Sequence, residues 1–219
     1  MTTGHVEIAG IRLELLPAGA VWWPAEAALL VADLHLGKAG VFRRAGLAVP
    51  EGDNAGTLNA LSALIQAMAP KALYLLGDIV HAAPGQDPAL LEQLAHWRAR
   101  HSRLPMTAIR GNHDRDTGPL AGLLHWVAEG ASHKGLRLFH HPPASASAVP
   151  WLAGHLHPVV KLQAGGDSLR LPAFVEVSDQ GLILPAFGHF TGGHPMPRTP
   201  GHRRYATSGK QVFALDASD

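Results

Sequence analysis

Two hydrophobic patterns divide the chain into a front half and a back half. In the front half, short continuous apolar runs alternate with stretches in which apolar residues recur every three or four positions. A continuous apolar run is typical of a strand covered on both faces of a sheet. We therefore expect strands in three segments: "AALLVADLH" (27–35), "ALYLLGD" (72–78) and "PMTAIRGNHD" (105–114).

The periodic stretches between these runs predict helices. Residues 53–69 carry apolar side chains at helical spacing, and Asp53 or Asn54 can cap the start of this helix. Residues 87–101 form a second predicted helix, which begins with a capping aspartate and a proline at the first helical position. Residues 118–128 are also expected to be helical.

The back half and the N-terminal segment are predicted to be mostly strand. Residues 5–23 show short alternating stretches that indicate a hairpin. Two further short strands are expected in "GLRLFHHPP" (135–143) and "PWLAGHLHP" (150–158). Two segments rich in glycine and proline, 142–150 and 191–204, are predicted to be loops.

These elements predict one α/β (α+β) domain over residues 1–219. Its chemistry-bearing motifs fall within residues 29–160, and residues 159–216 form a β-rich C-terminal part. A chain of 219 residues is long enough to bury a core without disulfides or structural metals. We leave the oligomeric state open.

Composition narrows the class of protein. The chain has no cysteine, which excludes disulfides and thiolate metal sites and fits the cytosol. It has neither the pattern of a signal peptide nor an apolar run of about 18 residues, so we expect a cytoplasmic protein with no membrane segment. The net charge of +1 provides no overall attraction to nucleic acid.

Polar side chains of one chemical kind follow each predicted strand of the central region. In open α/β sheets, sites form at the carboxyl ends of strands, so these side chains should converge. Carboxylates, an amide and imidazoles are a ligand set for divalent ions such as Mn, Fe or Zn. We also expect Asp33 and His35, two apart on an extended segment, to face the same way. The candidates are Asp33, His35, Asp78, His81, Asn112, His113, Asp114, His140, His141, His155 and His157.

The order of the motifs identifies a family resemblance. "DLH", "GDIVH", "GNHD", "HHPP" and "GHLH" occur in the order found in the calcineurin-like metallophosphoesterases, and the match spans roughly residues 29–160. The resemblance implies a four-layer sandwich, in which two β-sheets are flanked by helices, with two divalent metal ions at the sheet edge. Mn is the expected metal, with Fe, Zn or Ni as alternatives.

The resemblance also implies a role for each motif residue. His113 would protonate the leaving group, and Asp114 would orient its ring. Asp78 would bridge the two ions. The remaining ligands would be Asp33, His35 and His157 for the first ion, and Asn112, His140 and His155 for the second.

Several of these positions have an alternative interpretation. Asp33 alone could be a capping residue at a strand end, and Asp114 could cap the segment that follows it. His81 could support Asp78 from outside the ligand set or could simply be exposed. We assign His140 as the ligand because it lies nearer the strand end, but His141 is the competing candidate.

Basic side chains near the motifs are candidate contacts to substrate phosphates. Arg110 and Arg115 bracket the GNHD motif, and Lys38, Arg43 and Arg44 follow the first ligand loop. Charged residues on a surface are usually only solvated, so these five are the least specific part of the predicted site.

A narrower resemblance suggests the substrate. "DLHLGKAGVFRRAGLAVPEG", "GDIVHA", "GHLHPVVKL" and "LPAFGHFTGG" are similar to bacterial ligase-associated DNA damage response endonucleases. This resemblance implies a nuclease that cleaves phosphodiester bonds in single-stranded or damaged DNA and is linked to a DNA ligase and a helicase. One alternative is a phosphoesterase of small cyclic or nucleotide-like esters. Another is a non-catalytic scaffold. A scaffold of this kind is expected to have lost metal ligands, whereas this sequence keeps all of them.

Overall fold

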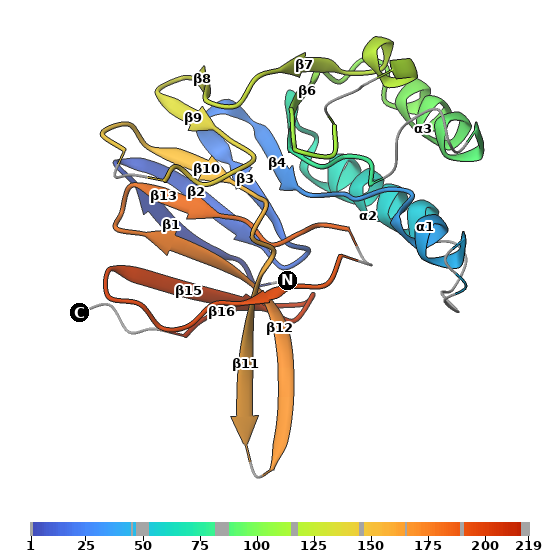
Figure 1. Cartoon of the computed structure of the whole chain (residues 1–219). Helices are drawn as coiled ribbons and strands as arrows, with labels where there is room; N and C mark the ends of the chain where they lie inside the picture. Colours follow the sequence, from blue (N-terminus) through green and yellow to red (C-terminus); the bar gives the residue numbers. More distant parts are fainter. Residues whose placement is uncertain are drawn as a thin grey trace.

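The computed structural model describes most of the chain. The described residues are 2–44, 46, 53–81, 88–114, 118–144, 147–164, 166–188 and 191–215. Two β-sheets pack face to face, and the helices cover the outer face of the first sheet (Figure 1). The expected sandwich is confirmed. In the described ranges α-helices cover only the first sheet, so the structure contains three of the four expected layers (Figure 1).

The first sheet has its strands in chain order. Its N-terminal strands are joined as antiparallel neighbours, and its later strands run parallel from β4 onward. The parallel strands therefore end at a common edge. The strands are β1 (Gly4–Ile8), β2 (Ile11–Leu16), β3 (Ala20–Trp23), β4 (Ala28–Ala32), β5 (Ala72–Leu76), β6 (Met106–Ile109) and β7 (His125–Val127).

The central strands of this sheet carry apolar side chains on both faces. Helices cover one of these faces and so bury its side chains. Leu29 and Val31 of β4 pack in one cluster with Leu61 and Trp97 of the helices. Leu30, between them, belongs to the core on the other face. The helices are α1 (Lys38–Arg44), α2 (Asp53–Met68) and α3 (Pro88–Arg100), with 3₁₀ turns η1 (Pro24–Glu26) and η3 (Gly118–Gly122).

The second sheet closes the core between the two layers. Phe174 and Leu182 are fully buried and pack against Leu30, Ala32 and Leu76 of the first sheet. Strand order is β14-β11-β12-β13-β10-β9-β8, and β15 pairs with β12 and β16. Its strands are β8 (Ala131–His133), β9 (Leu136–Leu138), β10 (Trp151–Ala153), β11 (Pro158–Ala164), β12 (Asp167–Val177), β13 (Gly181–Ile183), β14 (His194–Pro195), β15 (His202–Thr207) and β16 (Val212–Ala214).

Three sequence-based expectations about local structure were wrong or incomplete. Residues 118–128 are not one helix, because a 3₁₀ turn ends at Gly122 and β7 then pairs with the edge of β6. The predicted loop 191–204 contains β14 and the start of β15. Helix α1 was not predicted. No helix in the described ranges is long and apolar enough to cross a membrane.

Candidate metal centre

The predicted strand-end side chains do converge, and they come from both sheets. Asp33 and Asp78 follow β4 and β5 of the first sheet, whereas His140 follows β9 of the second. Side-chain atoms of Asp33, Asp78 and His140 lie within 4.8 Å of one another, and so do those of Asp33, His35 and His157. Because Asp33 belongs to both groups, they form one continuous cluster at the edge where the sheets meet.

The backbone at this cluster is left-handed, which the sequence did not predict. Strand β4 ends before Asp33, so the extended backbone expected at Asp33 and His35 was wrong, although ligand atoms of the two side chains still lie within 4.8 Å of each other. Non-glycine residues rarely adopt positive φ, and such positions gather at functional sites. The φ angles are 52° at Asp33, 45° at His35, 37° at Asp78, 68° at His155 and 45° at His157.

Backbone hydrogen bonds hold the first two loops side by side. The N–H of His35 donates to the carbonyl of Asp78 at 2.8 Å, and the N–H of Leu36 donates to the carbonyl of Ile79 at 2.9 Å. The N–H of His81 returns a bond to the carbonyl of Leu36 at 2.8 Å. The two loops therefore position their side chains as one unit.

In one half of the cluster, the histidines are held in the neutral form that binds metals. Nε2 of His35 lies 3.1 Å from Nε2 of His157, and Nε2 of His157 lies 3.6 Å from Oδ2 of Asp33. Burial, together with the nearby His157, lowers the pKa of His35 to about 2. Burial and the charge of Lys38 lower the pKa of His157 to about 4. Neutral imidazole is the ligand form of histidine.

The other half of the cluster is built around His140, which has no exposed surface. Its Nε2 lies 2.8 Å from Oδ1 of Asn112, 3.0 Å from Nδ1 of His155 and 3.6 Å from Oδ2 of Asp78. Burial lowers the pKa of His140, but the adjacent carboxylate of Asp33 outweighs it, so the net pKa is raised.

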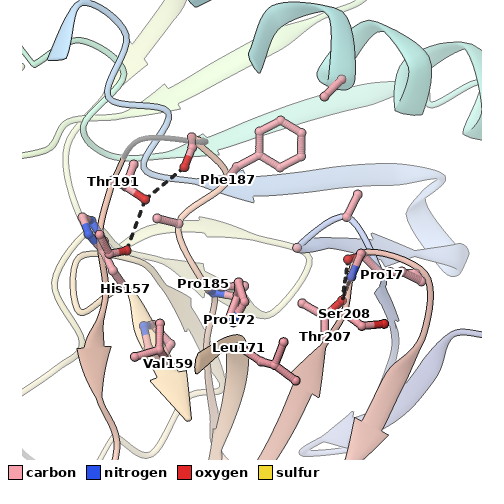
Figure 2. Close-up of a pocket in the computed structure, with 18 residues that line it drawn as sticks. Pro17, His157, Val159, Leu171, Pro172, Pro185, Phe187, Thr191, Thr207 and Ser208 are labelled. Carbon is pink, nitrogen blue, oxygen red and sulfur yellow. Dashed lines mark hydrogen bonds between the residues drawn. The ribbon is translucent and has the colours of Figure 1, made fainter. Parts of the chain in front are cut away.

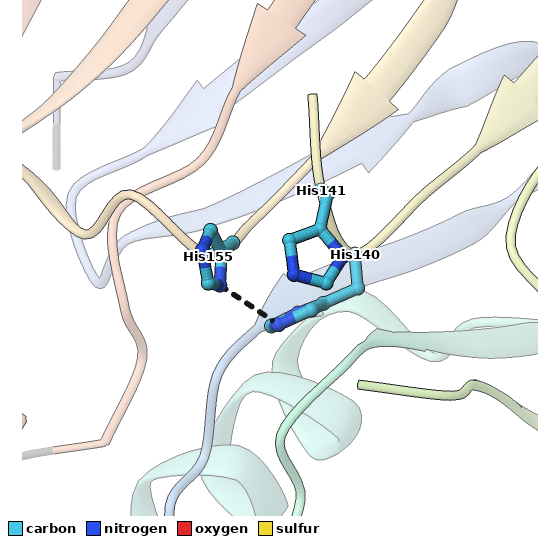
Figure 3. Close-up of side chains that lie close together, drawn as sticks. All are labelled: His140, His141 and His155. Atoms are coloured by element: carbon cyan, nitrogen blue, oxygen red, sulfur yellow. Dashed lines mark hydrogen bonds between the residues drawn. The ribbon is translucent and has the colours of Figure 1, made fainter. Parts of the chain in front are cut away.

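His140 and His141 both lie near His155 (Figure 3), but their surroundings differ. The side chain of His141 is 44% exposed, and its Nδ1 lies 2.8 Å from Oε1 of Glu129. The same carboxylate oxygen accepts the N–H groups of His140 at 3.0 Å and His141 at 2.7 Å. His141 still lies within reach of His140 and His155. The geometry favours His140 as the ligand. Glu129, which fixes this turn, has no motif around it and was missed.

Two buried atoms test whether these residues suit a cation. Oδ1 of Asp33 and Nδ1 of His140 lie 3.3 Å apart. Neither makes a hydrogen bond of normal geometry within the described part of the chain. Burial raises the pKa of Asp33 to about 6 even though His140 and the N–H of His155 lower it. A buried carboxylate that lacks a full set of partners is costly, and a divalent ion would compensate it. The residues therefore fit a metal.

Two glycines are required because ligand side chains pack directly on them. A Cβ added at Gly77, where φ is +77°, would overlap the ring of His140. A Cβ added at Gly111 would overlap the carboxylate of Asp78. Close packing of ligand side chains therefore explains why these two positions carry no side chain.

His113 lies at the open side of the cluster. Its N–H donates to Oδ1 of Asp78 at 3.0 Å, and its ring Nε2 lies 3.9 Å from Oδ2 of Asp78. The side chain is 39% exposed. His113 is thus held beside the cluster by its backbone while its ring remains accessible to a substrate.

Asp114 has a role that the sequence did not predict. Its buried carboxylate accepts the N–H groups of Ile79 at 3.1 Å, Val80 at 3.3 Å and Gly111 at 3.2 Å. These bonds join the loop after β5 to the loop after β6. They do not support the expected orientation of the His113 ring, and they make Asp114 a positioning residue for the two loops.

His81 and Lys38 lie next to the cluster. Nδ1 of His81 lies 3.4 Å from Nδ1 of His35, and its ring centroid lies 4.7 Å from that of His113, so His81 packs against these two histidines. The ammonium group of Lys38 donates to the carbonyl of Thr191 at 3.0 Å. Lys38 is half-buried, and burial lowers its pKa while Asp78 raises it. Lys38 thus places a cation at the edge of the site.

The predicted arginines contribute less to the described site. The guanidinium of Arg110 lies over the ring of Trp126, 5.5 Å from its centroid, on an exposed surface. Arg115 lies outside the described residues, as do the side chains of Arg43 and Arg44. Lys38 is therefore the basic side chain that the described structure brings to the cluster.

Comparison with known proteins agrees with this geometry. A model of the calcineurin-like phosphoesterase family matches residues 28–171. The chain belongs to this family. It is a metal-dependent phosphoesterase, and the divalent ions that the family implies fit the cluster described above.

Solved structures include one similar protein along the whole length of the chain. Nuclease MPE from Pseudomonas putida is 38% identical, with a TM-score of 0.84, and the match covers 98% of this chain and 100% of that one. Yfce, a phosphoesterase from E. coli, is 18% identical with a TM-score of 0.43, over 82% of this chain and 86% of that one. No curated protein matches the sequence.

Proposed function

We propose that this phosphoesterase hydrolyses phosphodiester bonds of single-stranded or damaged DNA with two divalent ions. The observation that carries the proposal is the continuity of the cluster, in which Asp33 and Asp78 lie close enough to His140 and His157 to serve adjacent ions. The similarity to a nuclease over the full length of the chain supports a nucleic acid as the substrate class.

The proposed ligands divide into two sets that share one carboxylate. Asp78 would bridge the ions, since it approaches both His35, at 3.8 Å, and His140, at 3.6 Å. The first set is Asp33, His35 and His157, and the second set is Asn112, His140 and His155.

Divalent ions held by these residues would supply Lewis acidity toward the phosphate and toward a water molecule. The protein residues position the substrate and move the proton. His113 donates a proton to the leaving alkoxide, because its ring is accessible and lies beside the cluster. Lys38 offers a positive charge to a phosphate oxygen of the substrate.

The proposal also includes a biological setting. Mn as the metal and a link to a DNA ligase and a helicase in DNA repair rest on the sequence resemblance, whereas a cytoplasmic location and a single domain rest on composition and length. The arginines Arg43, Arg44, Arg110 and Arg115 remain candidate contacts to the DNA backbone.

The test is hydrolysis of four substrates by the Mn-loaded protein. They are bis-p-nitrophenyl phosphate, p-nitrophenyl phosphate, 2′,3′-cyclic AMP and single-stranded DNA, with Asp78→Ala as the blank. Cleavage of the synthetic diester and the DNA is expected. Hydrolysis of only the monoester or the cyclic compound would keep the metal chemistry and remove DNA as the substrate.

A further inference from the structure

A cavity of about 430 Å³ opens directly beside the metal centre (Figure 2). His157, a proposed metal ligand, forms part of its wall. Another part of the wall is bonded to the first ligand loop, because the N–H of Gly188 donates to the carbonyl of Asp33 at 3.2 Å. A substrate with its phosphate at the cluster would therefore reach this cavity with the group attached to that phosphate.

The lining of the cavity is mostly apolar and includes several prolines. Figure 2 shows Pro172 and Pro185 side by side in its wall, with Val159 and Leu171 below them. Proline has a fixed ring and no N–H, so it offers an apolar surface without a donor. Ligand sites for small molecules have volumes of about 300–1,000 Å³ and a mostly apolar lining. The cavity suits a flat group with apolar faces.

The hydroxyl groups in the wall are already bonded within the protein. The hydroxyl of Thr191 donates to the carbonyl of Gly188 at 3.0 Å, and that of Thr207 donates to the carbonyl of Pro17. These two side chains are therefore committed to the wall. The cavity is built to recognise the shape of an occupant more than the hydrogen-bonding edge of one.

A positive charge lies near both the cavity and the metal cluster. Lys38 donates to the carbonyl of Thr191, which lines the cavity. Its charge also lowers the pKa values of His35 and His157, so the ammonium group is close to the cluster as well. The cation therefore adjoins both the cluster and the apolar cavity, an arrangement that complements a phosphate joined to an apolar group.

We propose that the cavity binds one unpaired nucleobase of the DNA strand whose phosphodiester lies at the metal cluster, a proposal that rests on the proposed function. Every nucleobase has flat π faces, so stacking on an apolar wall is tolerant of sequence. A base inside a duplex must leave the stack to enter such a cavity. The enzyme therefore prefers single strands and shows little preference among the four bases.

Two diesters with one leaving group test the proposal. Thymidine 5′-(p-nitrophenyl phosphate) carries a base, and methyl p-nitrophenyl phosphate carries none. We expect kcat/KM of the Mn-loaded wild type to be about tenfold or more higher for the thymidine ester, the size of one stacked base. The measurement is the ratio of the two kcat/KM values, which cancels any loss of active protein.

Two matched substitutions test whether the cavity causes the difference in kcat/KM between the two diesters. Ala60→Leu adds bulk at a half-buried position of α2 that lines the cavity, so the ratio should fall to near one. Ala63→Leu makes the same change at an exposed position of α2, and the ratio should stay at the wild-type value. If Ala60→Leu does not fold, Ala18→Leu replaces it, in the turn after β2 that also lines the cavity. A wild-type ratio in the folded cavity variant would overturn the proposal.

A binding measurement separates this proposal from the proposed function. The probes are a twelve-residue oligothymidylate and a twelve-residue abasic deoxyribose phosphate strand, each titrated into the Mn-loaded protein. We expect the oligothymidylate to bind about tenfold more tightly, and Ala60→Leu to remove the difference. If neither diester is hydrolysed but this difference appears, the catalytic proposal fails and the cavity proposal stands. Equal binding of both strands overturns the cavity proposal, whatever the activity.

Discussion

At the residue scale, the two adjacent histidines of the HHPP motif lie in different environments. His140 is fully buried among Asp33, Asp78 and Asn112, whereas His141 is exposed and bonded to Glu129. The sequence left the choice between the two histidines open, because both follow the same strand. Only the direction of each ring, which depends on the turn fixed by Glu129, separates them.

The two histidines should therefore respond differently to substitution. His140→Ala is expected to lose most bound Mn and at least about 100-fold in activity, because removal of a ligand weakens both. His141→Ala should keep its Mn content and change the rate by only a few-fold. Metal analysis after dialysis, together with diester hydrolysis, measures both. Loss of Mn in His141→Ala alone would reverse the assignment.

His113 is predicted to act on the substrate without holding metal. His113→Ala should keep the wild-type Mn content and lose about 10²–10⁴-fold in turnover of a diester with a poor leaving group. The loss should be much smaller for a p-nitrophenyl leaving group, which needs no proton. Full activity of His113→Ala on DNA would refute the role as an acid.

At the element scale, loops rather than strands determine the site. The predicted strands β4, β5 and β6 were confirmed, since their continuous apolar runs reflect burial on both faces. The left-handed backbone at Asp33, His35 and Asp78 was not predicted. Propensity does not favour such angles in these residues, and they are maintained by hydrogen bonds between loops that are distant in sequence.

In residues 118–128, tertiary contacts determine the structure more strongly than the helical pattern of the sequence does. Leu120, Leu123 and Leu124 have the spacing of a helix face, but Gly122 interrupts it. The following residues then complete the open edge of β6 as β7. Short edge strands of this kind carry little local signal, because their stability comes from the neighbouring strand.

Asp114 is predicted to matter through the loops it joins. Asp114→Ala would leave three buried N–H groups without their acceptor, and each such loss costs about 1–3 kcal/mol. We expect the free energy of unfolding of the metal-free protein to fall by about 2 kcal/mol or more, measured with urea, and Mn affinity to fall with it. Asp114→Asn, which keeps one oxygen acceptor, should lose less. Wild-type stability in Asp114→Ala would contradict this role.

At the scale of the whole molecule, the second sheet contains a buried charge network away from the metal centre. Glu176 is 1% exposed and pairs with Arg203, and the hydroxyl of Tyr205 donates to Glu176 at 2.8 Å. These residues link β12 to β15. Burial raises the pKa of Tyr205 above its usual value, and the hydrogen bond to Glu176 raises it further.

This network predicts a loss of stability in alkali. Below the unfolded-state pKa of about 10, tyrosine is protonated in both states and its titration does not affect stability. Above that pH the unfolded state releases the proton first, so the free energy of unfolding falls as pH rises. Tyr205→Phe lacks this proton, and its stability should fall less between pH 9 and pH 11. Urea unfolding at both pH values measures the difference, and equal slopes would contradict the prediction.

The central claim is that one cluster from both sheets holds two divalent ions. The most direct measurement is the number of Mn ions bound per chain, by calorimetric titration of the metal-free protein and of Asp78→Ala. The account predicts two ions in the wild type and, in Asp78→Ala, the loss of at least one together with diester hydrolysis. Binding of a single ion by the wild type, or two ions retained by Asp78→Ala, would contradict it.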